Sequence, residues 1–155
     1  MNKLEDIIDF DHHPIDNCSS YVKHSRSELK KNSILVLNNF LTKESLAELK
    51  REALALHNKA FYCSQNHNVL LTKKNPRFGD NHPCNVEIIS NKGCVPHDLI
   101  PQVSHLRTIY NSDIFQSFIK SLISRDEIYP YADTLSSINY NYYKPAKVSN
   151  FNLKP

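Results

Sequence analysis

The chain has 155 residues, of which 40% are hydrophobic and 23% charged, and its formal net charge is +3. Those proportions are ordinary for a globular protein, and the length is enough for one domain with its own core. Basic residues are spread along the chain instead of forming a stripe, so we expect no nucleic-acid partner. No apolar run approaches the ~20 residues of a membrane-spanning helix, and we expect no membrane partner.

The cysteines show no Cys-x-x-Cys spacing, so a structural zinc site is not expected; they are Cys18, Cys63, Cys84 and Cys94. The first residues carry acidic side chains and no apolar stretch, which is not the pattern of a signal peptide. Reduced thiols in the cytosol are the default for such a sequence. We therefore expect a cytoplasmic location.

The first half of the chain contains a polar segment followed by segments with strand-like and helix-like hydrophobic patterns. Residues 1–32 are polar and mixed, which predicts a loosely packed N-terminal arm. The apolar run Ser33–Phe40 predicts a short strand. Thr42 is a good N-cap, and apolar residues at helical spacing after it predict an amphipathic helix that ends near His57.

The pattern is weaker between Phe61 and Pro101. Two segments, Asn68–Thr72 and Asn85–Ser90, are strand-like, and proline and glycine between them predict a loop. The loop could be an exposed polar connection, or it could touch a ligand, because loops often carry binding groups. The side chains available for such contact are Arg77, Asp80 and His82.

The next segment, from Asp98 to Ser124, is helical in pattern and reads as two pieces. Asp113 is expected to cap the second piece. Its apolar residues recur at helical spacing and are expected in the core: Ile114, Phe115, Phe118, Ile119 and Leu122.

From Ser137 onward, alternation predicts a strand. Its residues Ser137, Asn139, Asn141 and Tyr143 would share one face, because side chains alternate between the two faces of a sheet. Such a polar face could be the solvent side of an edge strand, or it could line a polar cavity. The sequence leaves both possibilities open.

Several stretches occur in a recognisable order: "SHLRTIY" from Ser104, an apolar helix, "YPYAD" from Tyr129, and a strand containing Asn139. This order resembles the Fe(II)/2-oxoglutarate-dependent oxygenases, more narrowly the group of amino-acid hydroxylases and radical halogenases. That group typically shows Ser-x-Leu-Arg-x-Leu-Tyr, an apolar helix, Tyr-x-x-Ala-Asp-Pro-Leu-Gly, and then a strand with Asn. Thr134 and Ser136 stand where the family has Pro and Gly.

The resemblance implies an α+β fold, made of N-terminal helices and the first strands of a double-stranded β-helix (jelly-roll/cupin-like) with the barrel incomplete. It implies three segments: a polar N-terminal arm (1–32), the N-terminal part of an oxygenase-like domain (33–145), and a polar tail outside the family pattern (146–155). In the family, the strand leads into a turn of the type Gly-Asp-x-x-Gly-Trp-His-Phe-Asp, which begins the iron site.

This chain has no histidine after His105 and no His-x-Asp or His-x-Gly sequence. The remaining histidines offer no facial pair, because His97 and Asp98 are adjacent and His105 is expected on a helix outside the barrel. The low glycine content, two residues in all, fits a sequence without the family's glycine-rich turn. We therefore assign no catalytic or metal-ligating residue.

The resemblance thus predicts a truncated oxygenase that is inactive alone. Its parent family uses Fe(II) and 2-oxoglutarate on a small polar substrate such as a free amino acid, and neither cofactor is expected on this chain by itself. A downstream polypeptide fragment is a possible partner. The resemblance leaves open whether the parent enzyme hydroxylates or halogenates its substrate. The alternative function is a non-catalytic helix-and-strand domain that binds a protein partner through an exposed strand edge.

Candidate site residues follow from both lines of reasoning. The resemblance carries over Asn139 by position, as part of a substrate or cosubstrate cavity that a missing half would complete. Strand alternation adds Asn141 and Tyr143 to that cavity. Arg77 and Asp80 are candidates for a loop that covers the substrate.

Overall fold

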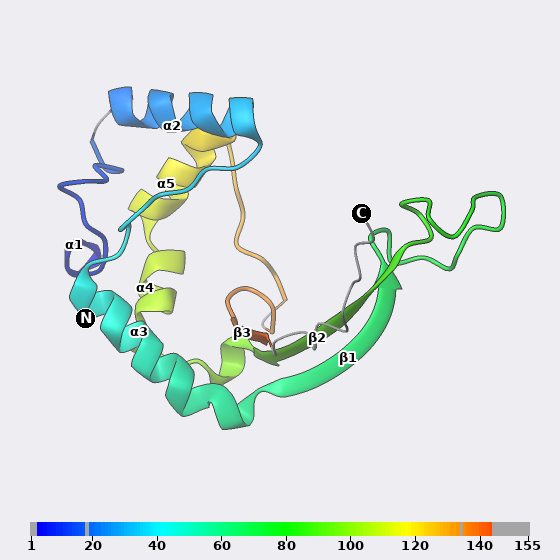
Figure 1. Cartoon of the computed structure of the whole chain (residues 1–155). Helices are drawn as coiled ribbons and strands as arrows, with labels where there is room; N and C mark the ends of the chain where they lie inside the picture. The colour runs from blue at the N-terminus through cyan, green and yellow to red at the C-terminus, as the bar shows by residue number, and fades with distance from the viewer. Residues whose placement is uncertain (1–2, 18, 134, 144–155) are drawn as a thin grey trace, which may run out of the picture. The chain divides into compact units, whose positions relative to one another are not determined.

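The computed structural model describes residues 3–17, 19–133 and 135–143, and it shows an α+β chain (Figure 1). The chain forms two compact units: unit 1 comprises Met1–Leu56 with Pro96–Asn139, and unit 2 comprises His57–Val95 with Tyr140–Pro155. The helices of unit 1 are α1 (Leu4–Ile7), α2 (Ser19–Asn32), α3 (Lys43–Leu56), α4 (His105–Tyr110) and α5 (Asp113–Leu122). Unit 2 holds the strands β1 (Phe61–Asn68), β2 (Glu87–Val95) and β3 (Tyr140–Tyr143).

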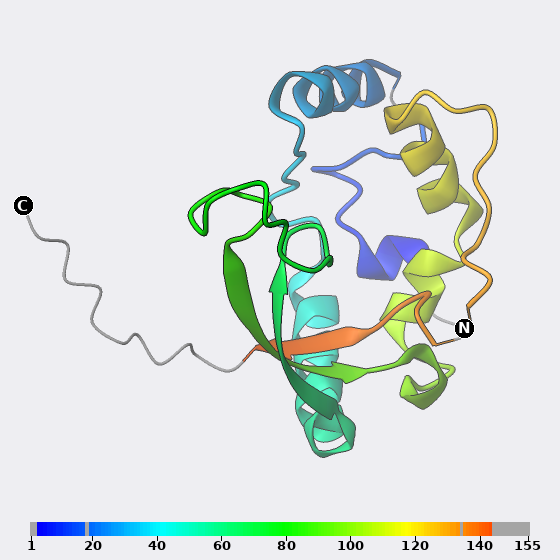
Figure 2. The same ribbon diagram turned by 90° about the vertical axis from the view of Figure 1, so that its right-hand side faces the viewer.

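The hydrophobic core of unit 1 joins the N-terminal residues to α5. Its buried members are Ile7, Ile8, Ile15, Phe118 and Leu122. Helix α2 lies across α5 in both views (Figure 1 and Figure 2) and adds Tyr21, Val22 and Leu29 to the edge of this core. The expectation of a loosely packed arm over residues 1–32 was wrong, because a few apolar side chains among many polar ones suffice to anchor this segment.

The segment Ser33–Phe40 does not form the expected strand. Its side chains alternate as in an extended segment: Ile34 and Val36 are exposed, whereas Leu35 and Leu37 pack against the core. However, its backbone joins no strand within the described residues, and a single β-bridge links its neighbour Leu41 to Ile8. The alternation predicted the side-chain directions correctly, but a strand also needs a neighbour to pair with.

The predicted helices of unit 1 are present, with one correction to a cap. Thr42 caps α3 as expected, since its Oγ1 accepts a hydrogen bond from the Ser45 backbone N–H at 3.2 Å. Ser112, not Asp113, caps α5: its Oγ accepts from the Phe115 N–H at 3.3 Å. Asp113 is the first helical residue, where its charge still suits the positive end of the helix dipole.

Unit 2 is an open antiparallel sheet with the strand order β1-β2-β3. Phe61 pairs with Cys94, and Asn68 pairs with Glu87 at the other end of the hairpin. The α+β class is therefore confirmed, while the described residues form three strands and no double-stranded β-helix. None of the described helices is long and apolar enough to cross a membrane.

Strand positions in unit 2 differ from those expected. Of the predicted strand Asn68–Thr72, only Asn68 belongs to a strand, as the last residue of β1, and the rest is a turn. The other residues of β1 lie before it, where the polar sequence "FYCSQNHN" gave no hydrophobic signal. The strand expected over Asn85–Ser90 begins at Glu87 and continues to Val95. The last strand begins at Tyr140 instead of Ser137. The predicted tail, 146–155, lies outside the described residues.

Candidate functional site

One face of the sheet carries two of the side chains singled out in the sequence. Asn141 and Tyr143 are both exposed and share this face of β3. The register places Asn141 opposite Cys94 and Tyr143 opposite Lys92. These neighbours give the face an amide, a phenol, a thiol and an ammonium group, which together can hydrogen-bond a small polar molecule and attract its carboxylate.

The other predicted site residues lie elsewhere in the chain. Asn139 precedes β3, is half-buried and belongs to unit 1, so it is not on the strand with Asn141. Arg77 and Asp80 are exposed on the loop between β1 and β2. Asp80 lies 3.6 Å from the Lys74 ammonium, an ion pair that contributes little because both side chains are exposed.

The opposite face of the sheet is aromatic and was not singled out in the sequence. The Tyr62 hydroxyl lies 2.6 Å from His57 Nε2, and the His57 ring meets the Tyr142 ring edge-on with centroids 4.9 Å apart. Gly93 lies beneath Tyr62, where a Cβ atom would come within 2.6 Å of the ring. Glycine is required here because any side chain would displace that ring.

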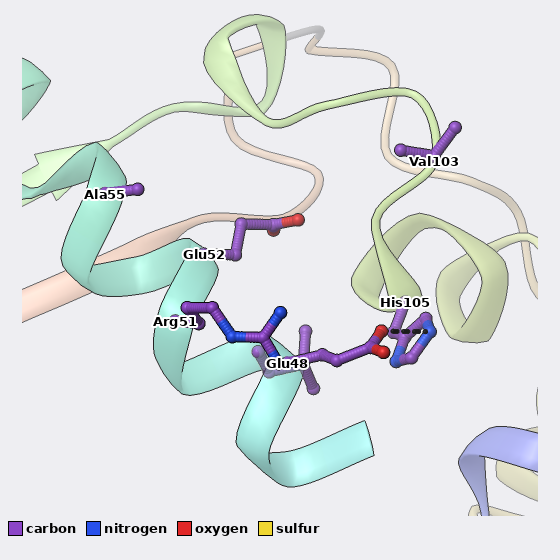
Figure 3. Close-up of a pocket in the computed structure, with 7 residues that line it drawn as sticks. Glu48, Arg51, Glu52, Ala55, Val103 and His105 are labelled. Atoms are coloured by element: carbon purple, nitrogen blue, oxygen red, sulfur yellow. Dashed lines mark ion pairs between the residues drawn. The ribbon is translucent and has the colours of Figure 1, made fainter. Parts of the chain in front are cut away.

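A cleft of about 400 Å³ in unit 1 also escaped sequence analysis (Figure 3). Helix α3 lines it with two glutamates and an arginine, Glu48, Glu52 and Arg51, and the start of α4 contributes His105. His105 was expected on a helix outside the barrel. The only hint of this cleft in the sequence is the pair of glutamates one turn apart on α3. The residues that meet this part of α3 lie some 50–60 residues away in sequence, so the cleft could not be predicted.

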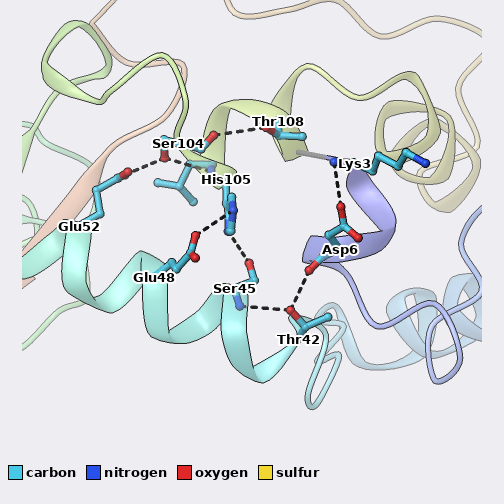
Figure 4. A network of polar contacts seen from close by, with 10 residues as sticks. Lys3, Asp6, Thr42, Ser45, Glu48, Glu52, Ser104, His105 and Thr108 are labelled. Atoms are coloured by element: carbon cyan, nitrogen blue, oxygen red, sulfur yellow. Dashed lines mark hydrogen bonds and ion pairs between the residues drawn. The ribbon is translucent and has the colours of Figure 1, made fainter. Parts of the chain in front are cut away.

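Charge and hydrogen bonding link the two walls of this cleft (Figure 4). His105 places Nε2 at 3.2 Å from the Glu48 carboxylate and Nδ1 at 2.9 Å from Ser45 Oγ. Beside it, the Ser104 hydroxyl donates to the Glu52 carboxylate at 2.7 Å and accepts from the Leu106 N–H, which caps α4. Two adjacent residues of α4's start therefore fasten it to α3.

The order hydroxyl, imidazole, carboxylate in Ser45, His105 and Glu48 is also the order found in hydrolase triads. A nucleophile must be reached by its substrate, yet Ser45 is only 1% exposed. We therefore interpret the three residues as a structural link between α3 and α4. Glu48 faces the cleft with a largely exposed side chain, so its carboxylate can still attract a cation there.

Arg107, from the stretch "SHLRTIY", fixes the turn that precedes α4. Its Nε donates to the Ile100 carbonyl at 3.0 Å, Nη2 donates to the His97 carbonyl at 2.7 Å, and Nη1 donates to His97 Nε2. Since a guanidinium can only donate, Nε2 must accept, and His97 carries its proton on Nδ1. That Nδ1 donates to Ser137 Oγ at 2.6 Å and so holds the segment leading to β3.

The described residues do not by themselves form an iron site. Within 3–17, 19–133 and 135–143, no three His, Cys, Asp or Glu side chains converge so that they could hold a metal ion. A non-haem Fe(II) centre needs such a facial set. We therefore assign no chemical step to these residues.

Comparison with protein-family models, with curated proteins and with solved structures found no match to this chain. The fold and the geometry given above are thus the basis for any functional conclusion.

Proposed function

We propose that this chain provides the N-terminal part of an Fe(II)/2-oxoglutarate-dependent oxygenase-like protein, and that it is inactive without a further segment that supplies the iron ligands. The substrate class would be a small polar molecule such as a free amino acid. The polar face of β3 is the observation that supports this proposal most, because β3 with the preceding Asn139 resembles the strand that leads to the iron site in the family.

In this proposal the chain binds and orients the substrate but does not activate oxygen. The Asn141 amide can both donate and accept, and the Tyr143 hydroxyl can do the same. Lys92, opposite Tyr143, offers a positive charge to a carboxylate. Fe(II) with 2-oxoglutarate, when bound by the ligands of the further segment, would supply the oxidising chemistry of the family.

The first test is to read the coding DNA beyond codon 155 in all three frames. We expect one frame to encode a glycine-rich turn with Trp-His-Phe-Asp or a close variant, followed by a distal histidine. If no frame does, the proposal fails. The alternative, a non-catalytic domain that binds a protein through a strand edge, would then be the function to test.

The second test combines the purified chain with that encoded segment and measures succinate formed from 2-oxoglutarate. We expect Asn141→Ala to raise the KM for the substrate about tenfold, the equivalent of one lost hydrogen bond. Asn91→Ala is the matched control, since Asn91 is exposed on the opposite face of β2. An equal effect of both substitutions would contradict a substrate-binding role for the Asn141 face.

A further inference from the structure

The loop 69–86, which extends beyond the ends of β1 and β2 (Figure 1), displays apolar side chains to solvent. Val69, Leu70 and Leu71 are 68%, 56% and 76% exposed, and Phe78 is also exposed. Three consecutive large apolar residues at this exposure are unusual for a loop, whose solvent-facing positions are commonly polar. We call Val69–Leu71, the first three residues after β1, the apolar tip.

Hydrogen bonds from two buried asparagine side chains, Asn68 and Asn85, fix the backbone of the loop that carries the apolar tip. The Asn68 side chain donates to the Thr72 and Cys84 carbonyls at 2.8 and 2.7 Å, and its Oδ1 accepts from the Leu70 and Thr72 N–H groups. Asn85 frames the second half of the loop in the same way, because its side-chain amide donates to several loop carbonyls: those of Asn75, Phe78 and Gly79. The exposure is therefore a built feature of the loop.

Cationic side chains follow the apolar tip directly. Lys73, Lys74 and Arg77 are exposed, and the loop carries one acid, Asp80, so its formal net charge is +2 with His82 neutral. Asp80 lies beside Lys74, which leaves the other two cations without an acidic partner among the described residues of the loop. Apolar side chains flanked by Lys and Arg are the composition of segments that bind anionic membrane surfaces.

We propose that loop 69–86 docks on an anionic phospholipid surface. The apolar tip enters the boundary between headgroups and acyl chains, while Lys73 and Arg77 contact lipid phosphates. Interfacial contact needs no spanning helix, so it is compatible with the helices observed, although it departs from the sequence-based expectation of no membrane partner. It is independent of the role proposed for the Asn141 face, because it rests on a different part of unit 2, and it assigns Arg77 to lipid instead of to a substrate-covering loop.

The test is flotation of the full chain with phosphatidylcholine vesicles, with and without about 30% phosphatidylserine. We expect the bound fraction to be several-fold higher on the anionic vesicles and to fall when salt is raised from about 0.05 to 0.5 M. Leu70→Ser with Leu71→Ser should abolish binding, and Lys73→Glu with Arg77→Glu should abolish the preference for anionic lipid. Ile34→Ser with Val36→Ser removes two similarly exposed apolar residues from unit 1 and should change nothing.

Three results would overturn the proposal: no vesicle binding, equal binding to neutral and anionic vesicles, or an equal loss in the Ile34/Val36 control. Sedimentation velocity adds a direct alternative. If the chain self-associates and the Leu70/Leu71 variant is monomeric without any vesicle effect, the apolar tip is a contact between copies. Circular dichroism of each variant shows whether the fold persists, so that lost binding is not mistaken for unfolding.

Discussion

Buried polar side chains in this protein connect segments that are distant in sequence. His13 lies 2.7 Å from the Tyr21 hydroxyl and 2.9 Å from the Asn38 carbonyl, and Ser45 meets His105 across 60 residues. Every buried side-chain nitrogen and oxygen in the described part of the chain has a partner. Removing one member of such a pair lowers the free energy of unfolding by more than the hydrogen bond itself contributes, because the other member stays buried without a partner.

The link between α3 and α4 gives a direct test of this point. We expect His105→Leu to lower the free energy of unfolding by about 1–3 kcal/mol, because the buried Ser45 hydroxyl loses its partner. Urea denaturation measures the change, with His24→Leu, at an exposed position of α2, as the control. Adding Ser45→Ala to His105→Leu should recover part of the loss. If the double variant is less stable than the single one, the interpretation is wrong.

The half-buried Asp9 and the exposed His12 form a pair whose titration can be followed. The hydrogen bond to Asp9 raises the pKa of His12 above 6.5, and the same bond lowers the pKa of Asp9 below 3.8. The pair therefore contributes its full stabilisation between pH 3.8 and pH 6.5, where Asp9 is charged and His12 is protonated. This stabilisation is lost as the pH rises through the pKa of His12 or falls through the pKa of Asp9. NMR titration of the Asp9→Asn variant should show a lower His12 pKa than in the parent chain. An unchanged His12 pKa would contradict the pairing.

At the scale of elements, the sheet depends on Gly93 and not on Gly79. Gly93→Ala should destabilise unit 2 by about 1–3 kcal/mol, because the added Cβ would meet the Tyr62 ring at 2.6 Å. That ring cannot turn aside without breaking its hydrogen bond to His57. Gly79→Ala is the matched control: nothing lies within 4 Å of its Cβ position. We expect Gly79→Ala to be neutral or to stabilise by about 0.4–1 kcal/mol.

Thermal unfolding followed by circular dichroism compares the two alanine variants with the parent chain. The Gly93 variant should melt at a lower temperature and the Gly79 variant at the same or a higher one. Equal melting of both variants would mean that the Tyr62 ring can move freely, and the tight packing described for this face would be incorrect.

Elements with a strong local signal were predictable from the sequence, and those that depend on distant partners were not. Helices α3 and α5 have apolar residues at helical spacing and nearby caps, so their positions were predicted closely. Helix α2 buries little beyond Tyr21, Val22 and Leu29, and β1 is a polar strand, so neither produced a clear pattern. The shared face of Asn141 and Tyr143 followed from alternation, whereas the cleft at Glu48 required knowing that α3 and α4 meet.

At the scale of the whole molecule, the helical unit has a small core on which its fold depends. Phe118 is 2% exposed and stacks on Tyr21 with ring centroids 6.1 Å apart. Phe118→Ala should lower the free energy of unfolding by about 3–5 kcal/mol, which is a large share of the total for a domain of this size. Hydrogen exchange should show faster exchange throughout α2 and α5. Phe61→Ala, at a residue 73% exposed, is the control and should leave those helices protected.

If α2 and α5 stayed protected in the Phe118 variant, the core would not be the source of their stability. The same experiment compares the units, since peptides of β1 and β2 report on unit 2 separately. We expect these to respond less than the α2 and α5 peptides, because none of the buried residues of the core cluster belongs to unit 2.

Asn68 and Asn85 fix the backbone course of the loop independently of which side chains the loop exposes. Both asparagines bond mainly to backbone groups, which every residue type except proline provides in full. Mutations at exposed loop positions such as Leu70, Lys73 or Arg77 can therefore change what the surface recognises while the backbone keeps its course. Such a loop can acquire new specificities in evolution one substitution at a time, and a library randomised at those positions should yield mostly folded proteins.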